Sequence, residues 1–345
     1  MAKIKDICEI LDFKRVPITA SDRKSGIYPY YGANGIQDHV DDYIFDDELV
    51  LLAEDGGYFG SSERPIAYRV SGKCWVNNHA HVLKPKDVVD VDYLCYSLMF
   101  RDVSSIVNGA TRQKLTQADM KEIDIPVPLL IEQHAIVQIL NKVFGLISLR
   151  KQQLSKLDEL VKSRFIEMFD GKYATKPLHD VCEELFAGGD VKKDKTSDAQ
   201  SDEYPYPIYT NGEKDNGLYG YTSLVRVTKE AVTISGRGTI GFTCLRKEPF
   251  YPAVRLIVAV PKQDLVSGCY LQHFIQSKNY GGQGASIPQL TVPMIKDELI
   301  PVPPIDLQNE FASFVEQTDK SKFEIQKSLE KLETLKKALM QKYFG

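Results

Sequence analysis

Cysteine is sparse in this sequence: six cysteines occur in 345 residues, and no two of them form a Cys-x-x-Cys pair. Small zinc sites depend on such closely spaced cysteines, so we do not expect one here. Long apolar runs are also lacking, and none reaches the roughly 18 residues that a membrane-spanning helix needs. Residues 1–6 lead into no apolar signal core. We therefore expect a cytoplasmic protein with reduced cysteines and no membrane partner.

The motifs of common catalysts are lacking as well. The sequence has no Gly-x-x-x-x-Gly-Lys-Ser/Thr loop, which cradles phosphates in ATP-driven motors. It has no Asn-Pro-Pro-Tyr-like or glycine-rich cofactor loop of the kind that an adenine methyltransferase carries. His79 and His81 look like a metal pair on one strand face, but no third ligand at a suitable spacing is visible, so we expect a structural role for them. We predict that the chain is not an enzyme and itself binds neither a metal nor a cofactor.

An excess of positive charge is also missing, since the formal net charge is −4. Residues 1–108 carry 12 basic and 17 acidic side chains, whereas residues 172–283 carry 14 basic and 13 acidic ones. Lysine and arginine supply most of the non-specific affinity of proteins for DNA, because they neutralise phosphates. If the chain binds DNA, we expect it to use local basic patches or to act together with a basic partner.

What the sequence does contain is an internal duplication. Residues 109–116 (Gly-Ala-Thr-Arg-Gln-Lys-Leu-Thr) match residues 284–291 (Gly-Ala-Ser-Ile-Pro-Gln-Leu-Thr). In the same register, residues 125–128 (Ile-Pro-Val-Pro) match residues 300–303 (Ile-Pro-Val-Pro). A repeat of this length indicates two related domains rather than a solenoid of short units. Two such domains on one chain suit a ligand with two similar halves, and duplex DNA is the commonest ligand of that kind.

Each copy has the pattern of a mixed α/β domain followed by one long helix. Candidate buried strands at 47–53 and 230–235 are each followed by a glycine loop. The Pro-Val-Pro segments cannot lie inside a helix, because proline lacks the N–H group and restricts its predecessor. We predict an α+β fold with pseudo-two-fold symmetry, in which two tandem mixed α/β domains are joined by two long antiparallel coiled-coil helices. The predicted boundaries are 1–129 and 172–304 for the domains, and 130–171 and 305–345 for the helices.

The two helical stretches carry a narrow apolar seam at spacings of three and four residues, with charged residues on their other faces. Each helix alone would expose its seam, so we expect the two to pair. A roughly two-fold relation between the copies would make them antiparallel. Ordinary core helices are the alternative explanation. The seam residues that we expect at the contact between the helices, or at a partner surface, are Leu154, Leu157, Val161, Leu329, Leu332 and Leu339.

Two pairs of loops occupy equivalent places in the copies. Residues 57–60 (Gly-Tyr-Phe-Gly) and 238–241 (Gly-Thr-Ile-Gly) follow the candidate strands, and they either approach DNA or serve only to reverse the chain. The stretch before each Leu-Thr pair either contacts a base or phosphate or only begins a helix, with Thr116 and Thr291 as N-caps. These last two interpretations are compatible, because a threonine can cap the helix while its neighbours face DNA.

The end of each domain resembles a known family. Leu115-Thr116, residues 123–128 and Glu132-Gln133 look like the closing motif of the target-recognition domains of type I restriction-modification specificity subunits. The second copy repeats this motif at Leu290-Thr291, residues 299–304 and Gln308. The resemblance covers essentially the whole chain, with two recognition domains that are each followed by a spacer helix.

The resemblance implies a subunit that binds double-stranded DNA without catalysing a reaction. Each recognition domain would read one half of a bipartite target, and the antiparallel helices would set the gap between the halves. The helices would also dock two methyltransferase (modification) subunits, which bring S-adenosylmethionine. Restriction (motor and nuclease) subunits would join this assembly and use ATP and magnesium. By analogy, the expected DNA-binding residues are Tyr58, Ser61, Ser62, Arg112, Gln113, Lys114, Arg237, Thr239, Gln283, Ser286 and Gln289.

The chain departs from the family pattern in two respects. The loops differ between the copies, with Gly-Tyr-Phe-Gly against Gly-Thr-Ile-Gly, so the two half-sites should differ in sequence. The first domain is acidic, which argues against strong DNA binding by the chain alone. An alternative therefore stays open: an orphan or degenerate specificity-like scaffold that binds protein partners without reading DNA.

Overall fold

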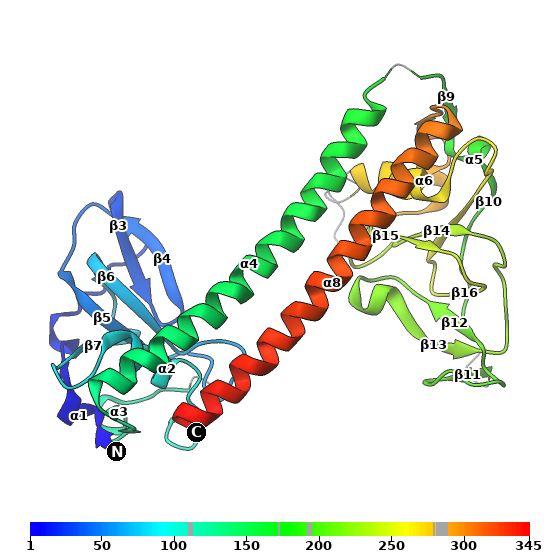
Figure 1. The fold of residues 1–345 in the computed structure, drawn as a ribbon. Coiled ribbons are helices and arrows are strands. Elements are labelled where there is room, and N and C mark those ends of the chain that lie inside the picture. The colour runs from blue at the N-terminus through cyan, green and yellow to red at the C-terminus, as the bar shows by residue number, and fades with distance from the viewer. Residues whose placement is uncertain (110–112, 172, 192–194, 279, 281–288) are drawn as a thin grey trace. The chain divides into compact units, whose positions relative to one another are not determined.

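The computed structural model describes the chain apart from residues 110–112, 172, 192–194, 279 and 281–288. It divides into two compact units: residues 1–151 with 327–345 form the first, and residues 152–326 form the second. Two long helices, α4 (Leu130–Phe169) and α8 (Ile305–Phe344), each contribute to both units (Figure 1). No helix in the described part of the chain combines the length and the apolar character that crossing a bilayer requires.

The first unit is built around one mixed sheet. Its elements are β1 (Ala2–Lys3), α1 (Ile4–Ile7), β2 (Cys8–Ile10), the 3-10 helix η1 (Asp12–Lys14), β3 (Ser25–Gly32), β4 (Gly35–Val40), β5 (Phe45–Ala53), β6 (Ala67–Val76), β7 (Ala80–Pro85), α2 (Val91–Met99), α3 (Gln117–Lys121) and β8 (Asp124–Ile125). Six strands form the sheet in the order β2-β7-β5-β6-β3-β4 (Figure 1). The central strand β5 is buried on both faces: Val50 and Leu52 belong to one core cluster, and Leu49 and Leu51 belong to another. The predicted buried strand at 47–53 is confirmed.

The second unit repeats this plan with two smaller sheets. Its elements are β9 (Thr175–Pro177), α5 (Leu178–Val181), β10 (Cys182–Ala187), β11 (Thr196–Ser197), β12 (Tyr206–Tyr209), η3 (Lys214–Gly217), β13 (Leu218–Thr222), β14 (Ala231–Ile234), β15 (Thr243–Arg246), β16 (Tyr251–Pro252), β17 (Ile257–Pro261), α6 (Gly268–Ser277), α7 (Val292–Ile295) and β18 (Leu299–Pro301). One sheet has the order β10-β17-β14-β15, and the other has the order β11-β13-β12-β16. Strand β14 confirms the buried strand predicted at 230–235.

The sheet is continuous in the first unit and divided in the second because one strand is interrupted. The ten-residue strand β6 pairs antiparallel with β5 and parallel with β3, so it joins the two parts of the sheet. In the second unit β15 makes the equivalent antiparallel pairing with β14, and β16 makes the parallel pairing with β12. Pro249 lies between β15 and β16. A proline has no N–H to donate to a neighbouring strand, which is consistent with the break at this point.

Segments of the two long helices run antiparallel within each unit. In the first unit, Lys151 on α4 pairs with Glu333 on α8 at 3.2 Å, and the earlier residue Phe144 lies beside the later residue Lys336. In the second unit, Asp158 pairs with Lys322 at 2.6 Å and Arg164 pairs with Glu310 at 3.3 Å. In both units, residues later in α4 contact residues earlier in α8. The antiparallel direction predicted from the sequence is confirmed within each unit.

Short helices begin where the sequence supplies an N-cap. Asp90 accepts the N–H of Tyr93 at the start of α2, and Ser267 accepts the N–H of Tyr270 at the start of α6. Thr116 caps α3 as predicted, since its hydroxyl oxygen accepts the N–H of Asp119 at 3.2 Å. The matching expectation for Thr291 is wrong. It occupies the N-cap position of α7 but makes no capping hydrogen bond, and its φ of −131° differs from that of Thr116.

Candidate nucleic-acid interface

Three chain segments meet beyond the end of strand β5 in the first unit. The Leu115 N–H donates to the carbonyl oxygen of Glu54 at 2.7 Å, and the Gly56 N–H donates to that of Gln113 at 3.3 Å. The side-chain amide of Asn34, in the turn between β3 and β4, donates to the carbonyl oxygen of Gly56 at 3.0 Å. The glycine loop and the stretch before Leu115, which lie far apart in the sequence, are therefore neighbours in the fold.

The second unit has the same junction beyond the end of β14. The Leu290 N–H donates to the carbonyl oxygen of Gly236 at 2.9 Å. The side-chain carbonyl oxygen of Asn211 accepts the N–H of Gly236 at 2.7 Å. The Arg237 guanidinium then donates to the side-chain oxygen of Gln289 at 3.3 Å. Both units thus bring a glycine loop, an Asn-Gly turn and the segment before a leucine to one end of a central strand.

The candidate residues of the first unit lie on the surface of this junction. Tyr58 is 39% exposed, and the Arg64 guanidinium lies 4.6 Å from the centre of its ring. The Ser61 hydroxyl oxygen accepts the N–H of Arg64 at 3.0 Å, which holds the loop in a tight turn. Ser62 is exposed. Their part in DNA binding stays a prediction.

The segment before Leu115 is exposed but anchored. Gln113 and Lys114 are both exposed. The Lys114 ammonium lies 2.9 Å from a carboxylate oxygen of Glu54, so part of its charge is already neutralised. Arg112 lies outside the described residues. A role for this segment in reading DNA stays a prediction.

The candidate residues of the second unit are equally accessible. Arg237 and Thr239 are exposed, and Gln289 is half-buried. Gln283 and Ser286 lie outside the described residues. Gly60 and Gly241, which close the two loops, both have a φ of +81°, a left-handed conformation that favours glycine. The two loops therefore end in the same backbone conformation, whereas at their starts Gly238 has a φ of +67° and Gly57 does not have a positive φ.

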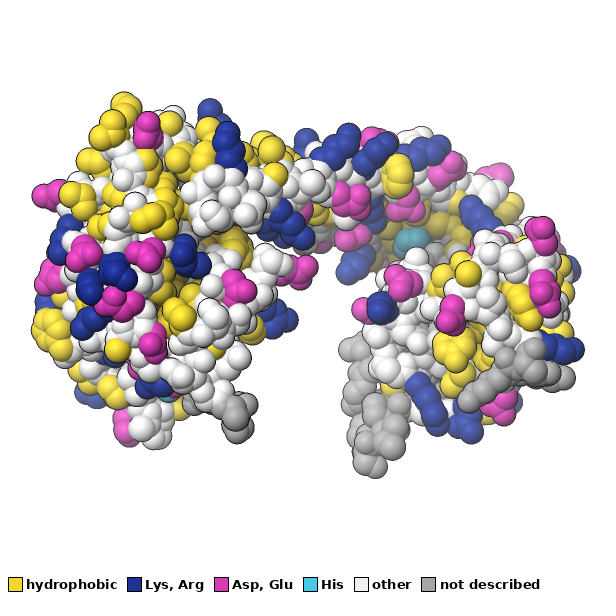
Figure 2. Space-filling view, turned by 90° about the horizontal axis from the view of Figure 1, so that it is seen from below, with side chains coloured by type: hydrophobic (Ala, Val, Ile, Leu, Met, Phe, Trp, Pro, Cys, Tyr) yellow, Lys and Arg dark blue, Asp and Glu magenta, His cyan; other side chains and the backbone are white. Residues whose placement is uncertain are grey.

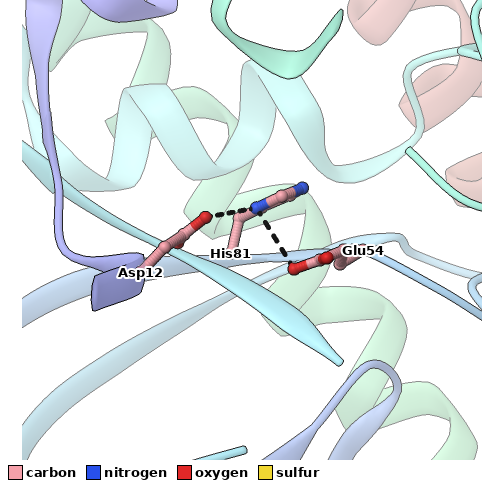
Figure 3. Close-up of side chains that lie close together, drawn as sticks. All are labelled: Asp12, Glu54 and His81. Carbon is pink, nitrogen blue, oxygen red and sulfur yellow. Dashed lines mark hydrogen bonds and ion pairs between the residues drawn. The ribbon is translucent and has the colours of Figure 1, made fainter. Parts of the chain in front are cut away.

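A buried polar network supports the junction in the first unit (Figure 3). His81 is fully buried, and its Nδ1 lies 2.7 Å from a carboxylate oxygen of Asp12. Its Nε2 lies 2.9 Å from the carbonyl oxygen of Leu115. Glu54 approaches the same ring at 3.6 Å and is itself held by the Arg15 guanidinium at 2.5 Å. Both ring nitrogens of His81 therefore contact oxygen atoms of other segments.

Neighbouring donors stabilise the ionised carboxylates of Asp12 and Glu54 in this network. Burial opposes ionisation of Asp12, but the His81 ring and hydrogen bonds from Gln117 and Val82 outweigh it, so the pKa of Asp12 lies below its usual range. Burial likewise opposes ionisation of Glu54, and Arg15 and Lys114 reverse the effect to lower the pKa of Glu54.

Asp12, Glu54 and His81 have donor atoms close enough together to hold a cation. We interpret them instead as a structural brace, since protein donors already occupy these oxygens. His81 thus has carboxylate neighbours that its local sequence did not reveal, because Asp12 and Glu54 come from distant segments. Its contact with Leu115 ties the candidate reading segment to the core.

A second duplicated feature attaches each long helix to its domain. Gln133, fully buried, accepts the N–H of Asp90 at 2.9 Å and donates to the carbonyl oxygens of Val88 and Pro128 at 3.0 and 2.8 Å. Gln308 makes the same three contacts with Ser267, Leu265 and Pro303. The sequence showed that these glutamines match but not what they do.

The predicted seam residues are less exposed than the charged faces of the helices. Val161 and Leu329 are 5% and 8% exposed. The others are half-buried, namely Leu154, Leu157, Leu332 and Leu339. In the second unit Val161 belongs to the main core cluster, beside Phe165 and Phe311. These positions therefore contribute to packing in the units, and their role toward a partner stays a prediction.

Charges of both signs cover the surface. Figure 2 shows lysine and arginine side chains interspersed with aspartate and glutamate over the described residues on that face. Several basic residues are already paired, such as Arg226 with Glu184 at 2.7 Å and Lys3 with Glu122 at 2.9 Å. This mixture agrees with the nearly balanced composition. Any DNA affinity of the chain must come from a few local cations rather than from a broad basic surface.

The chain is similar to known specificity proteins along its whole length. The family described as "Type I restriction modification DNA specificity domain" matches residues 1–159 and again residues 171–337. A candidate type I restriction enzyme specificity subunit of Haemophilus influenzae is 30% identical over 347 residues, covering 91% of this chain and 86% of the relative. A candidate type I specificity subunit of Mycoplasma pneumoniae is 29% identical over 327 residues, covering 90% of this chain and 86% of the relative.

Two solved structures share the fold. The crystal structure of a type I restriction-modification S subunit from M. genitalium matches with a TM-score of 0.65 at 16% identity, covering 99% of this chain and 95% of that one. A structure described as explaining complex assembly and conformational transition of the type I restriction-modification system matches with a TM-score of 0.57 at 15% identity, covering 99% and 96%. The chain therefore shares its fold with a solved S subunit.

Proposed function

This chain belongs to the type I restriction modification DNA specificity domain family, and on that premise we propose that it selects the DNA sequence on which a multisubunit enzyme acts. Each unit would read one half of a bipartite target in double-stranded DNA. The family role is specificity and not catalysis. The reactions would belong to modification and restriction subunits, which would bring S-adenosylmethionine, ATP and magnesium.

One observation carries this proposal: the same junction of three segments occurs in both units with different exposed side chains. The backbone contacts are shared, since Leu115 bonds to Glu54 in one unit and Leu290 bonds to Gly236 in the other. The side chains presented there are Tyr58 in the first unit and Arg237 in the second. Base edges in the major groove are told apart by the donors and acceptors that a protein presents. A conserved frame with variable side chains therefore suits the reading of two different half-sites.

The long helices would act as the spacer and as the docking surface for two modification subunits. Each contains 40 residues, which corresponds to about 60 Å at 1.5 Å per residue. Gln133 and Gln308 fix the start of each helix to its own domain through buried hydrogen bonds. A rigid attachment of this kind is what a spacer of defined length needs.

The direct test is selection from a pool of random duplexes by the chain in complex with its modification subunit. We expect enrichment of a motif with two specified halves separated by unspecified base pairs. A scaffold that only holds protein partners would form the complex and show no sequence preference. That result would replace the proposed function with the scaffold alternative.

A further inference from the structure

An arginine beside the second reading loop occupies an unusual backbone position. Between β16 and β17, the Leu256 N–H donates to the carbonyl oxygen of Ala253 at 3.1 Å and closes a four-residue turn. The two central residues, Val254 and Arg255, have φ values of +49° and +62°. Such a turn normally uses Asn-Gly or Gly-Gly, because side chains with a Cβ are disfavoured in the left-handed region. A β-branched valine is among the least suitable residues there.

Contacts with two other segments hold the turn in this conformation. The N–H groups of Val254 and Arg255 donate to the carbonyl oxygens of Gly189 and Gly188 at 2.9 and 3.0 Å. The side-chain amide of Asn211 donates to the carbonyl oxygen of Val254 at 2.7 Å. Strained backbone of this kind persists only where the surroundings fix it, and it is concentrated at functional sites.

The same asparagine connects this turn to the reading loop. The side-chain oxygen of Asn211 accepts the N–H of Gly236, so a single amide joins the Val254 turn to the residue before Arg237. A Cβ on Gly236 would lie 3.5 Å from the carbonyl oxygen of Arg255, which places the two backbones side by side. Arg255 is exposed, and its guanidinium makes no ion pair or hydrogen bond with any residue that the structure describes. It is therefore available to a ligand.

The corresponding position in the first unit is different. The turn before β7 is equivalent, because the Asn77 N–H donates to the carbonyl oxygen of Tyr31 just as that of Ala253 donates to Tyr209. The residue at the place of Arg255 is His79, whose Nδ1 lies 2.7 Å from a carboxylate oxygen of Asp55. In the first unit this position therefore pairs with an acidic group, whereas in the second unit the Arg255 guanidinium has no such partner among the described residues.

We propose that Arg255 contacts a base edge in the half-site read by the second unit, an inference that rests on the proposed function. Arginine commonly reads guanine through two hydrogen bonds in the major groove, and this requires a well-placed backbone. The fixed turn supplies that placement beside Arg237 and Gln289, whereas a contact to a phosphate would not need it. Arg255 is thus a specificity-determining residue. It lies outside the loops that were identified by matching the two repeats.

The test compares variants of the full chain in complex with its modification subunit, using selection from random duplexes and affinity for the wild-type motif. Arg255→Ala should weaken binding by about tenfold or more and remove the preference at one or two positions of one half-site. Arg255→Lys should weaken the same preference, because the lysine ammonium lacks the planar fork of donors that arginine presents in a fixed geometry. Lys229→Ala is the control: Lys229 lies just before β14, at the opposite end of that strand from Gly236, and pairs with Glu183. Its substitution removes a positive charge and should leave the motif unchanged.

Two results would overturn the inference while leaving the proposed function intact. In one, both Arg255 variants keep the wild-type preference at every position. In the other, they weaken binding evenly without changing the motif, as a phosphate contact would. If the wild-type complex itself selects no motif, the proposed function fails, and this inference fails with it.

Discussion

Gln133 and Gln308 occupy the same position in the two repeats and make the same three buried hydrogen bonds. Each accepts one N–H at the start of a short helix and donates to two carbonyl oxygens, one of them on the proline that precedes its own long helix. These shared hydrogen bonds explain why both repeats have a glutamine after the Pro-Val-Pro segment. It fixes the direction in which each long helix leaves its domain.

Replacing Gln133 with leucine should loosen this attachment. The substitution leaves the N–H of Asp90 and two carbonyl oxygens without partners in a buried place, at a cost of about 3 kcal/mol. We expect faster hydrogen exchange at residues 88–94 and little change in residues 172–304. Gln138→Leu, on an exposed part of the same helix, is the control. Unchanged exchange in Gln133→Leu would show that the attachment does not depend on this side chain.

Phe311 should be the most sensitive position of α8 in the second unit. It is fully buried and packs edge-on against Phe165 and Phe169 of α4, with ring centres 5.4 and 5.5 Å apart. Phe311→Ala should lower the free energy of unfolding of this unit by about 3 to 5 kcal/mol, because it removes apolar contacts and leaves a cavity.

Phe323 lies on the same helix and is 65% exposed, so Phe323→Ala is the control and should change stability little. Urea unfolding followed by circular dichroism measures both variants. Equal effects of the two substitutions would contradict the packing described for α4 and α8 in this unit.

The Asp12 network should make the first unit sensitive to acid. The pKa of Asp12 is lowered in the folded state, so its contribution is present above the ordinary carboxyl range near about 4 and is lost as the pH falls through the folded pKa. Asp12→Asn should destabilise the first unit at pH 7 by about 3 kcal/mol, because His81 loses its buried partner. It should also flatten the loss of stability as the pH falls below the ordinary carboxyl range near about 4.

The exposed residue Asp41 provides the control, as Asp41→Asn removes a carboxylate without disturbing a buried network. Urea unfolding of the variants at several pH values measures the effect. If Asp12→Asn and the wild type lose stability in parallel on acidification, another group controls the acid response.

The sequence predicts the regular parts of this fold because their signals are local. Alternation and apolar runs identified β5 and β14, prolines excluded helix from the segments before α4 and α8, and a three- and four-residue spacing identified both long helices. The duplication then showed which loops are equivalent. The sequence did not predict which residues from distant segments become partners, even for His81, whose structural role was expected. His81 lies next to Asp12 and Glu54 only after three strands have paired, and nothing in its neighbourhood indicates this.

The sequence predicted the outline of the candidate site, because its main segments occur in both repeats. The glycine loops and the segments before Leu115 and Leu290 were found because they recur. The turn at Val254–Arg255 was not, since a Val-Arg pair carries none of the usual turn signals and only tertiary contacts impose its left-handed conformation. The asparagine that connects this turn to the reading loop was visible only as part of an Asn-Gly dipeptide.

The spacer role predicts a change in the length of the unread gap. Inserting one heptad in α4 and a matching heptad in α8 should lengthen the helices by about 10 Å. This equals roughly three base pairs of duplex DNA at about 3.4 Å each. The motif selected from random duplexes should keep both halves and gain about three unspecified pairs. A selected motif with the original gap would contradict the spacer role.

The central claim is that each unit reads its own half of the target. The most direct measurement replaces residues 172–283 with the matching block of a relative and selects from random duplexes in complex with the modification subunit. We predict that one half of the selected motif changes to the relative's sequence while the other half and the gap stay as in the wild type. A change in both halves, or in neither, would contradict the claim.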